Sequence, residues 1–239
     1  MEHTHVLGVV PARGGSKGIR RKNMAVLAGR PLLDYTVDAA KGSSSLTRIV
    51  VSTDDDEIAS HAVSLGVQVP FMRSKELAAD DTPILPVLRD LLEKLKSTEG
   101  YEPDLLVLLQ PTSPFRQGRH IDEAVRLLLG SGCDSVVSVV RVPHQFNPLS
   151  VMSMEDGRLV GLGPRSPCSV LRRQDKPLVY ARNGPAVLVT RTEIIVQRNE
   201  LYGSDTRGVV MAEEESLDID TAWDLKLAES ILAMGGGGA

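Results

Sequence analysis

The sequence has few aromatic residues, no excess of positive charge and no long apolar run, and each shortage excludes a class of protein. Aromatic residues make up 3% of the 239 residues, and the formal net charge is −4. Proteins that bind nucleic acids usually present a basic face, and those that bind single strands usually add aromatic stacking platforms. No stretch approaches the roughly 18 uninterrupted apolar residues of a transmembrane helix. We therefore expect neither a nucleic-acid partner nor a membrane span.

Cysteine is also scarce, and the N-terminus lacks the features of a secretion signal. Cys133 and Cys168 are the only two cysteines, and nothing in the sequence pairs them. Residues 1–5 contain neither the basic region nor the apolar core of a signal peptide. Because disulfides belong mainly to oxidising compartments, the sequence predicts a reduced, cytoplasmic protein.

Short apolar runs alternate with amphipathic segments along most of the chain, which indicates an α/β fold. The apolar runs predict strands at residues 6–10, 48–52, 105–109, 135–142, 186–189 and 209–212, with a further short strand at 67–69. The intervening segments predict helices at about 31–42, 53–65, 83–96, 121–129, 192–198 and 221–234. The run Leu105–Leu109 is apolar without interruption, which is typical of the centre of a parallel sheet.

Residues 143–182 break this alternation. They contain several prolines and short, weakly periodic runs, so we expect a protruding arm with little core of its own. The α/β domain would then comprise residues 1–142 and 183–234, with the arm inserted at 143–182 and a flexible tail at 235–239.

The first predicted strand leads into a loop that is rich in glycines and cations. Gly14, Gly15 and Gly18 would let successive backbone N–H groups turn inward to form an anion site, to which Arg13, Lys17 and Lys22 add positive charge. The spacing matches neither a P-loop nor a dinucleotide-binding fingerprint, and an ordinary glycine turn with solvated cations is the alternative. Ligands of open α/β sheets gather at the carboxyl ends of strands, so the position of the loop favours a phosphate site.

Other polar groups follow later strands. Gln110 ends the buried run and offers the donors and acceptors that a nucleobase edge requires, although it could equally cap a turn. Asp218 and Asp220 are two residues apart in an extended segment, so both carboxylates can face one ion, as Mg²⁺ sites with substrate phosphates require. Asp220 could instead cap the last helix, and so could Thr221.

Three more groups of residues have a structural interpretation beside a functional one. The acidic run at 53–57 is more typical of a helix cap than of a metal site. Arg172 and Arg173 suit recognition of a carboxylate or phosphate, or form a solvated surface. His61, His120 and His144 are candidates for acid–base work, but a lone histidine is more often structural or exposed.

The opening residues 11–19, together with Lys22 and Asn23, resemble the signature of acylneuraminate cytidylyltransferases, the CMP-sialic acid synthetases. Further similar segments follow in the family's order and span nearly the whole chain: 52–55, 69–73, 109–114, 173–174, 183–184 and 216–220. The resemblance implies a Rossmann-like, mainly parallel sheet flanked by helices, and a homodimer in which the arm reaches into the partner's active site. It also implies transfer of CMP from CTP to the anomeric hydroxyl of a nine-carbon or similar 2-keto sugar acid, with release of pyrophosphate.

The resemblance assigns roles position by position. The loop residues Ala12, Arg13, Gly14, Ser16, Lys17 and Lys22 would hold the triphosphate, and Arg13, Lys17 and Lys22 would act as the catalytic cations. The ribose and cytosine would be contacted by Asn23, Arg73, Thr82 and Gln110. The sugar acid would face Arg173, Gln174, Tyr180 and Asn183, and Mg²⁺ would be held by Asp218 and Asp220.

The chain departs from the family pattern mainly around the acceptor. Arg20-Arg21 stands where the family often has a proline, residues 183–187 differ from the usual sequence, and residues 143–148 lack the common lysine. These differences leave the acceptor sugar open. Two alternatives remain at this stage: a sugar-phosphate nucleotidyltransferase that uses GTP or another NTP, and a nucleotide-binding relative without turnover.

Overall fold

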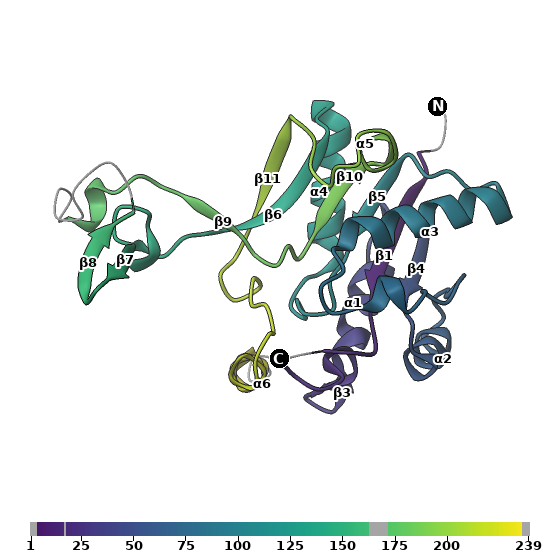
Figure 1. The fold of residues 1–239 in the computed structure, drawn as a ribbon, viewed down its shortest axis with the longest axis horizontal. Coiled ribbons are helices and arrows are strands. Elements are labelled where there is room, and N and C mark those ends of the chain that lie inside the picture. Colours follow the sequence, from purple (N-terminus) through teal and green to yellow (C-terminus); the bar gives the residue numbers. More distant parts are fainter. Residues whose placement is uncertain (1–3, 17, 163–171, 236–239) are drawn as a thin grey trace.

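The computed structural model describes residues 4–16, 18–162 and 172–235, and its core is a seven-stranded sheet. The main strands are β1 (Val6–Pro11), β4 (Arg48–Ser52), β5 (Leu105–Leu108), β6 (Ser135–Arg141), β10 (Leu188–Arg191) and β11 (Thr206–Met211), in the spatial order β11-β6-β10-β5-β1-β4. The short strand β9 (Tyr180–Arg182) pairs with the end of β6. The α/β class and the mainly parallel sheet are confirmed (Figure 1).

Two strands run against the expected parallel direction, β10 and the short β9. β10 lies antiparallel between β5 and β6, so β5 has a parallel neighbour on one side only. The reason is the arm: the chain leaves β6 at its carboxyl end and returns at the same end of the sheet, and the described part of the arm holds no α-helix that could carry the chain across. A strand that starts where its neighbour stopped must run back antiparallel.

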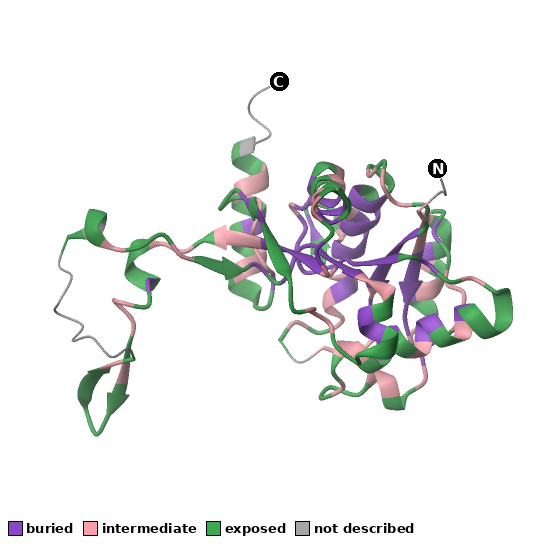
Figure 2. Cartoon of the chain, turned by 90° about the horizontal axis from the view of Figure 1, so that it is seen from above, coloured by how far each residue is buried: buried purple, intermediate pink, exposed green. Residues whose placement is uncertain are grey.

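Helices cover both faces of this sheet. On one face lie α1 (Leu32–Lys41), α2 (Asp56–Ser64) and α4 (Gly118–Ser131), and on the other lie α3 (Ile84–Glu99) and the short α5 (Thr192–Gln197). Each face of the sheet forms its own hydrophobic core with the helices that cover it, and successive strand residues point to opposite faces. Leu105 and Val107 lie in the core under α1, α2 and α4, and Leu106 and Leu108 lie in the core under α3 and α5. Figure 2 shows these buried strands enclosed by helices whose outer sides are exposed.

The helix ends follow their local sequences. Asp55 caps α2 by accepting hydrogen bonds from the N–H groups of Glu57 and Ile58 at 2.9 and 3.0 Å, which confirms the capping interpretation of the acidic run. The helix α4 begins three residues before the predicted start, because Gln117 and His120 form a reciprocal cap. At 67–69 the structure has an isolated bridge, Val50 to Gln68, in place of the predicted strand.

The last helix, α6 (Ala222–Gly235), packs on a small hairpin rather than on the central sheet. The hairpin consists of β2 (Val26–Leu27) and β3 (Arg30–Pro31), and Leu27, Ile219 and Ala228 form the buried contact. The tail predicted at 235–239 lies outside the described residues except for Gly235, which ends α6.

The arm extends away from the domain body (Figure 1). It contains two short 3₁₀ helices, η3 (His144–Phe146) and η4 (Arg173–Asp175), and the hairpin of β7 (Met152–Glu155) and β8 (Arg158–Gly161). Two further 3₁₀ helices, η1 (Lys22–Met24) and η2 (Glu76–Ala78), lie in the body. The described part of the arm is largely exposed, whereas the domain body has a buried interior (Figure 2).

Candidate active site

A cavity of about 490 Å³ lies at the carboxyl ends of β1, β4 and β5. Three parts of the chain form its walls: the loop after β1, the segment 73–87, and the turn after β5 with Asp220. Its polar lining includes most of the residues expected to bind the nucleotide, namely Arg13, Ser16, Lys22, Asn23, Arg73, Thr82 and Gln110. Lys17 lies outside the described residues.

The loop after β1 is tied to the start of α2. The N–H of Ala12 continues the ladder to Ser52 at 2.9 Å, and the N–H of Gly14 donates to Asp54 Oδ1 at 3.0 Å. A Cβ on Gly14 would lie 2.7 Å from Asp55 Oδ2, so this position requires glycine. The Gly14 N–H that we expected to face an anion is therefore already bonded to a carboxylate, and the cations carry the attraction for phosphate.

Arg13 bridges the loop to the opposite wall of the cavity. Its Nη1 donates to the carbonyl of Ala79 at 2.9 Å and pairs with Asp80 Oδ1 at 2.9 Å. The carbonyl of Arg13 accepts from Asn23 Nδ2 at 2.8 Å, so the amide of this buried asparagine closes the loop on itself. On the far wall, Thr82 donates to the carbonyl of Glu76 at 2.9 Å and holds the 76–82 turn closed.

Lys22 joins the loop to the end of the chain. Its Nζ lies 2.8 Å from Asp220 Oδ1, and Asp220 is 198 residues away in sequence. Gly18 makes the same junction through the backbone, since a Cβ there would overlap the carbonyl oxygen of Asp220. The glycine-rich loop and the carboxylate segment therefore form one surface.

The carboxylate pair offers what a divalent cation needs. Asp218 Oδ1 is buried and has no hydrogen-bond partner among the described residues. Burial raises the pKa of Asp218, and the neighbouring Asp220 carboxylate adds to the rise. The Thr112 hydroxyl lowers it, although its contact with Asp218 falls outside normal hydrogen-bond geometry. Mg²⁺ is usually held by one or two carboxylates together with substrate phosphates, so these residues fit that ion.

Asp220 does not cap the last helix. Thr221 and Asp224 share that role: Asp224 Oδ2 accepts from the Thr221 N–H at 2.7 Å, and Thr221 Oγ1 accepts from the Asp224 N–H at 3.3 Å. The alternative that Thr221 caps the helix is thus confirmed, and the Asp220 side chain faces Lys22 and the cavity.

Two polar residues at strand ends are held by backbone carbonyls. Arg73 donates from Nη2 to the carbonyl of Ser52 at 2.6 Å, and burial lowers its pKa. Gln110 donates from Nε2 to the carbonyl of Gly184 at 3.1 Å. Both side chains are therefore oriented before any ligand binds.

Arg116, which sequence reasoning missed, lies in the interior behind Gln110. The side chain is fully buried and donates to the carbonyls of Gln110 at 3.0 Å and Ala186 at 2.9 Å, and to Thr36 Oγ1 at 2.6 Å. Burial lowers the pKa of Arg116 to about 9, so the guanidinium is still charged at neutral pH. The only signal in the sequence is an arginine at the end of an otherwise neutral turn, and nothing local indicates that it points inward.

The residues expected to face the sugar acid do not line this cavity as a group. Gln174 and Tyr180 are exposed and belong to the arm, not to the lining of the cavity, and the side chain of Arg173 lies outside the described residues. Asn183 is buried, and its amide is occupied by the protein: Nδ2 donates to Ser216 Oγ at 3.0 Å, and Oδ1 accepts from Ser138 Oγ at 2.6 Å. A contact between Asn183 and a substrate would require these bonds to break.

Two of the three candidate histidines have structural contacts. His61 Nε2 lies 2.6 Å from Asp34 Oδ1 on α1, and His120 is buried against Glu215. His144 lies in the arm, in η3. No group of three or more histidine, cysteine, aspartate or glutamate side chains that could hold a metal occurs in the described parts of the chain.

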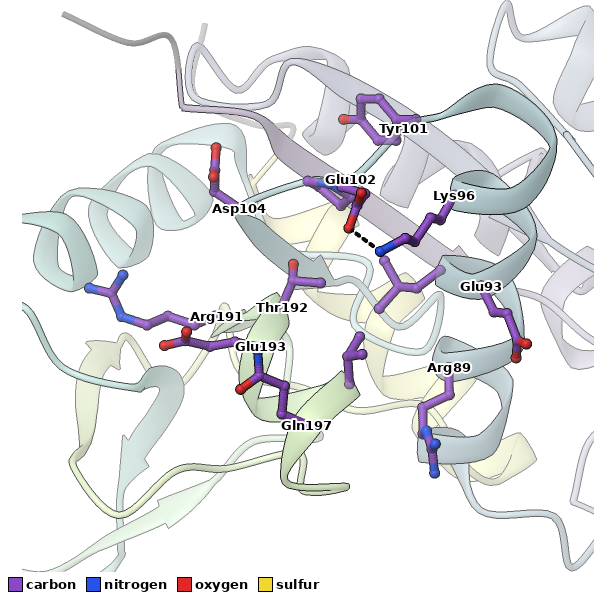
Figure 3. Close-up of a pocket in the computed structure, with 13 residues that line it drawn as sticks. Arg89, Glu93, Lys96, Tyr101, Glu102, Asp104, Arg191, Thr192, Glu193 and Gln197 are labelled. Atoms are coloured by element: carbon purple, nitrogen blue, oxygen red, sulfur yellow. Dashed lines mark hydrogen bonds and ion pairs between the residues drawn. The ribbon is translucent and has the colours of Figure 1, made fainter.

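A second cavity, of about 610 Å³, lies at the opposite end of β5 (Figure 3). It opens between α3 and α5, where Lys96 pairs with Glu102 at 2.8 Å and Arg89 stands beside Glu93. Acidic and basic side chains alternate around it, so it offers no concentrated charge to an anion. It is larger, but it lies away from the residues described above.

The family is decided by a comparison with protein-family models. The model described as Cytidylyltransferase matches residues 7–231. The chain belongs to the cytidylyltransferase family. This confirms the family resemblance and the expected class of enzyme.

Individual relatives of this cytidylyltransferase have related names. A CMP-N,N'-diacetyllegionaminic acid synthase of Legionella pneumophila is 36% identical over 96% of this chain and 97% of its own length. An N-acylneuraminate cytidylyltransferase of Streptococcus agalactiae serotype V is 34% identical over 90% of this chain, which spans half of that longer protein. A CMP:2-keto-3-deoxy-manno-octonic acid synthetase complexed with CTP matches with a TM-score of 0.72 at 15% identity, covering 97% of this chain and all of that one, and shows the same fold.

Among the described residues, no helix is both long enough and apolar enough to cross a bilayer.

Proposed function

We propose that this cytidylyltransferase transfers CMP from CTP to the anomeric hydroxyl of a sialic-acid-like 2-keto sugar acid. The observation that carries the proposal is the single cavity into which Arg13, Lys22, Arg73, Gln110 and Asp220 converge. The names of the relatives support the acceptor class.

In this reaction the hydroxyl oxygen bonds to the α-phosphorus while the bond from that phosphorus to its bridging oxygen breaks. Pyrophosphate leaves with the electron pair, and the hydroxyl proton passes to solvent. Negative charge grows on the departing pyrophosphate, so cations placed beside it lower the barrier. Arg13 and Lys22 are suited to this because each already pairs with a carboxylate that a phosphate can replace.

We further propose that Asp218 and Asp220 hold Mg²⁺. When bound, the ion would neutralise phosphate charge and lower the pKa of the sugar hydroxyl, so that no histidine base is required. The unpaired, buried oxygen of Asp218 supports this assignment, since buried carboxylate oxygens normally have a partner.

The proposed functional unit is a homodimer in which the arm of one subunit completes the site of the other. Two observations support it: Gln174 and Tyr180 belong to the arm and do not line the cavity of their own chain, and apolar side chains of the arm are uncovered. Phe146 and the cross-strand pair Met154 and Leu159 are each at least 60% exposed, and exposed apolar groups that lie together mark interaction surfaces.

The proposal is tested by pyrophosphate release from a crossed panel of substrates with Mg²⁺ present. CTP, GTP, UTP and ATP are each combined with N-acetylneuraminate, N,N'-diacetyllegionaminate, a 2-keto-3-deoxy-octonate and a sugar 1-phosphate. We expect turnover only with CTP and one or more of the sugar acids. Turnover with a sugar 1-phosphate alone, or none with any sugar acid, would contradict the proposal.

A further inference from the structure

The segment that carries Asp218 and Asp220 has no regular structure to hold it. It runs from the end of β11 at Met211 to the start of α6 at Ala222, and these described residues form turns and extended chain. Its position therefore depends on a few specific contacts. One is the hydrogen bond from the N–H of Ile219 to the carbonyl of Thr112 at 2.8 Å, and another is the bond between Ser216 and Asn183.

Glu215 supplies a third contact, with the first turn of α4. Its side chain is 17% exposed, and Oε2 lies 3.2 Å from Nε2 of His120, whose side chain is almost completely buried. Arg119 also pairs with Glu215, but its side chain is 59% exposed, so solvent weakens that ion pair. The buried imidazole is the better anchor.

The hydrogen bonds define the tautomer of His120. Nδ1 accepts the backbone N–H of Gln117 at 3.0 Å, and an N–H can only donate, so Nδ1 carries no proton. The proton is then on Nε2, which donates to Glu215. Burial lowers the pKa of His120, Arg119 lowers it further, and the Glu215 and Glu123 carboxylates oppose this, so the neutral form persists at neutral pH.

One imidazole thus joins two walls of the same site. Its Nδ1 fixes the start of α4, directly after the turn from which Thr112 accepts the Ile219 N–H, and its Nε2 fixes Glu215, three residues before Asp218. We propose that His120 is a positioning residue that, through Glu215, sets the place of the Asp218 and Asp220 carboxylates. The inference rests on the proposed function, because it assigns these carboxylates to Mg²⁺.

Two substitutions of His120 distinguish the acceptor role of Nδ1 from the donor role of Nε2. In His120→Asn the amide oxygen can stand in for Nδ1, which preserves the helix cap but removes the donor to Glu215. In His120→Gln the amide nitrogen can stand in for Nε2, which preserves the donor to Glu215. Substitution of a group bonded directly to a metal ligand typically weakens metal affinity by about 10–100-fold, and His120 acts one step farther out, so the lower end of that range applies.

We expect His120→Asn to raise the Mg²⁺ concentration for half-saturation about tenfold, and His120→Gln to raise it less than about threefold. Two readouts are used at saturating CTP: turnover, and the fluorescence of Trp223, the only tryptophan, which lies three residues after Asp220. Glu215→Ala should reproduce the effect of His120→Asn, and Glu215→Gln, which keeps an acceptor oxygen, should restore much of the affinity. These Glu215 variants decide the question if either His120 variant fails to fold.

The inference is overturned if the Gln variant is impaired as much as the Asn variant, or if Glu215→Ala leaves the Mg²⁺ dependence unchanged. Either result would reduce His120 to a helix cap. If the wild-type enzyme responds to Mg²⁺ in neither readout, the metal assignment itself fails, and the two failures are thereby distinguished.

Discussion

Gly18 is the position where the loop after β1 depends most directly on the absence of a side chain. An added Cβ would overlap the carbonyl oxygen of Asp220, at a separation well under the 3.0 Å that real Cβ atoms keep from other heavy atoms. In Gly18→Ala one of the two backbones must therefore retreat, by roughly 0.5–1 Å, and the loop cations move away from the carboxylate segment. Misplacement by about 1 Å can reduce an enzymatic rate by about 10²-fold.

The same loop provides a matched control. A Cβ on Gly15 would have no heavy atom within 4 Å, and neither glycine has a positive φ that alanine would strain. We expect Gly18→Ala to lower kcat/KM for CTP by about 10–100-fold and Gly15→Ala to change it less than about threefold, as measured by pyrophosphate release. The thermal midpoint of both variants should stay close to that of the wild type, because the loop surface is partly exposed. A Gly18→Ala enzyme with wild-type kinetics, or an equal loss in Gly15→Ala, would refute this account of the junction.

Three further substitutions test separate parts of the structure. Arg116→Met leaves the buried carbonyls of Gln110 and Ala186 without their donor, so calorimetry should show a loss of about 3 kcal/mol or more and a fall in Tm of about 10 °C; an unchanged Tm would contradict it. Lys22→Met should change Tm little, because an exposed ion pair contributes at most about 1 kcal/mol, yet it should lower kcat/KM for CTP about 100-fold; a parallel small effect on both would remove Lys22 from the catalytic cations. Burial would raise the pKa of Asp122, but hydrogen bonds from Ser43, Ser45 and Ser44 outweigh it and lower the pKa to about 2 from an ordinary 3.8. A carboxyl whose pKa is lowered by folding stabilises the native state above its ordinary pKa and loses that contribution as the pH falls from about 4 to 2. Denaturation at several pH values should therefore show Asp122→Asn to be less stable by on the order of 1 kcal/mol at pH 7 and equal to wild type near pH 2; a difference independent of pH would show that the carboxylate is not the cause.

Local sequence determined the elements and where the chemistry lies along the chain. Apolar runs such as Leu105–Leu109 and the acidic cap at Asp55 act through contacts within a few residues, so their periodicity and composition suffice to predict them. The glycine and lysine positions after β1 followed from the sequence in the same way. Ends of neighbouring parallel strands meet at one edge of a sheet, which is why Arg13 and Gln110 could be expected to share a cavity. Arg73 was expected there only from the family resemblance.

Tertiary structure decided what each side chain does with its hydrogen bonds. Asn183 has a side chain that could bind a substrate, but its amide is already hydrogen-bonded to Ser138 on the neighbouring strand and to Ser216 in the 212–220 segment. The antiparallel direction of β10, the burial of Arg116 and the pairing of His120 with Glu215 all depend on contacts between residues 51 to 95 positions apart in the chain. Periodicity carries no information about such partners. Their positions are fixed only when the strand order is set and the loops close over the sheet.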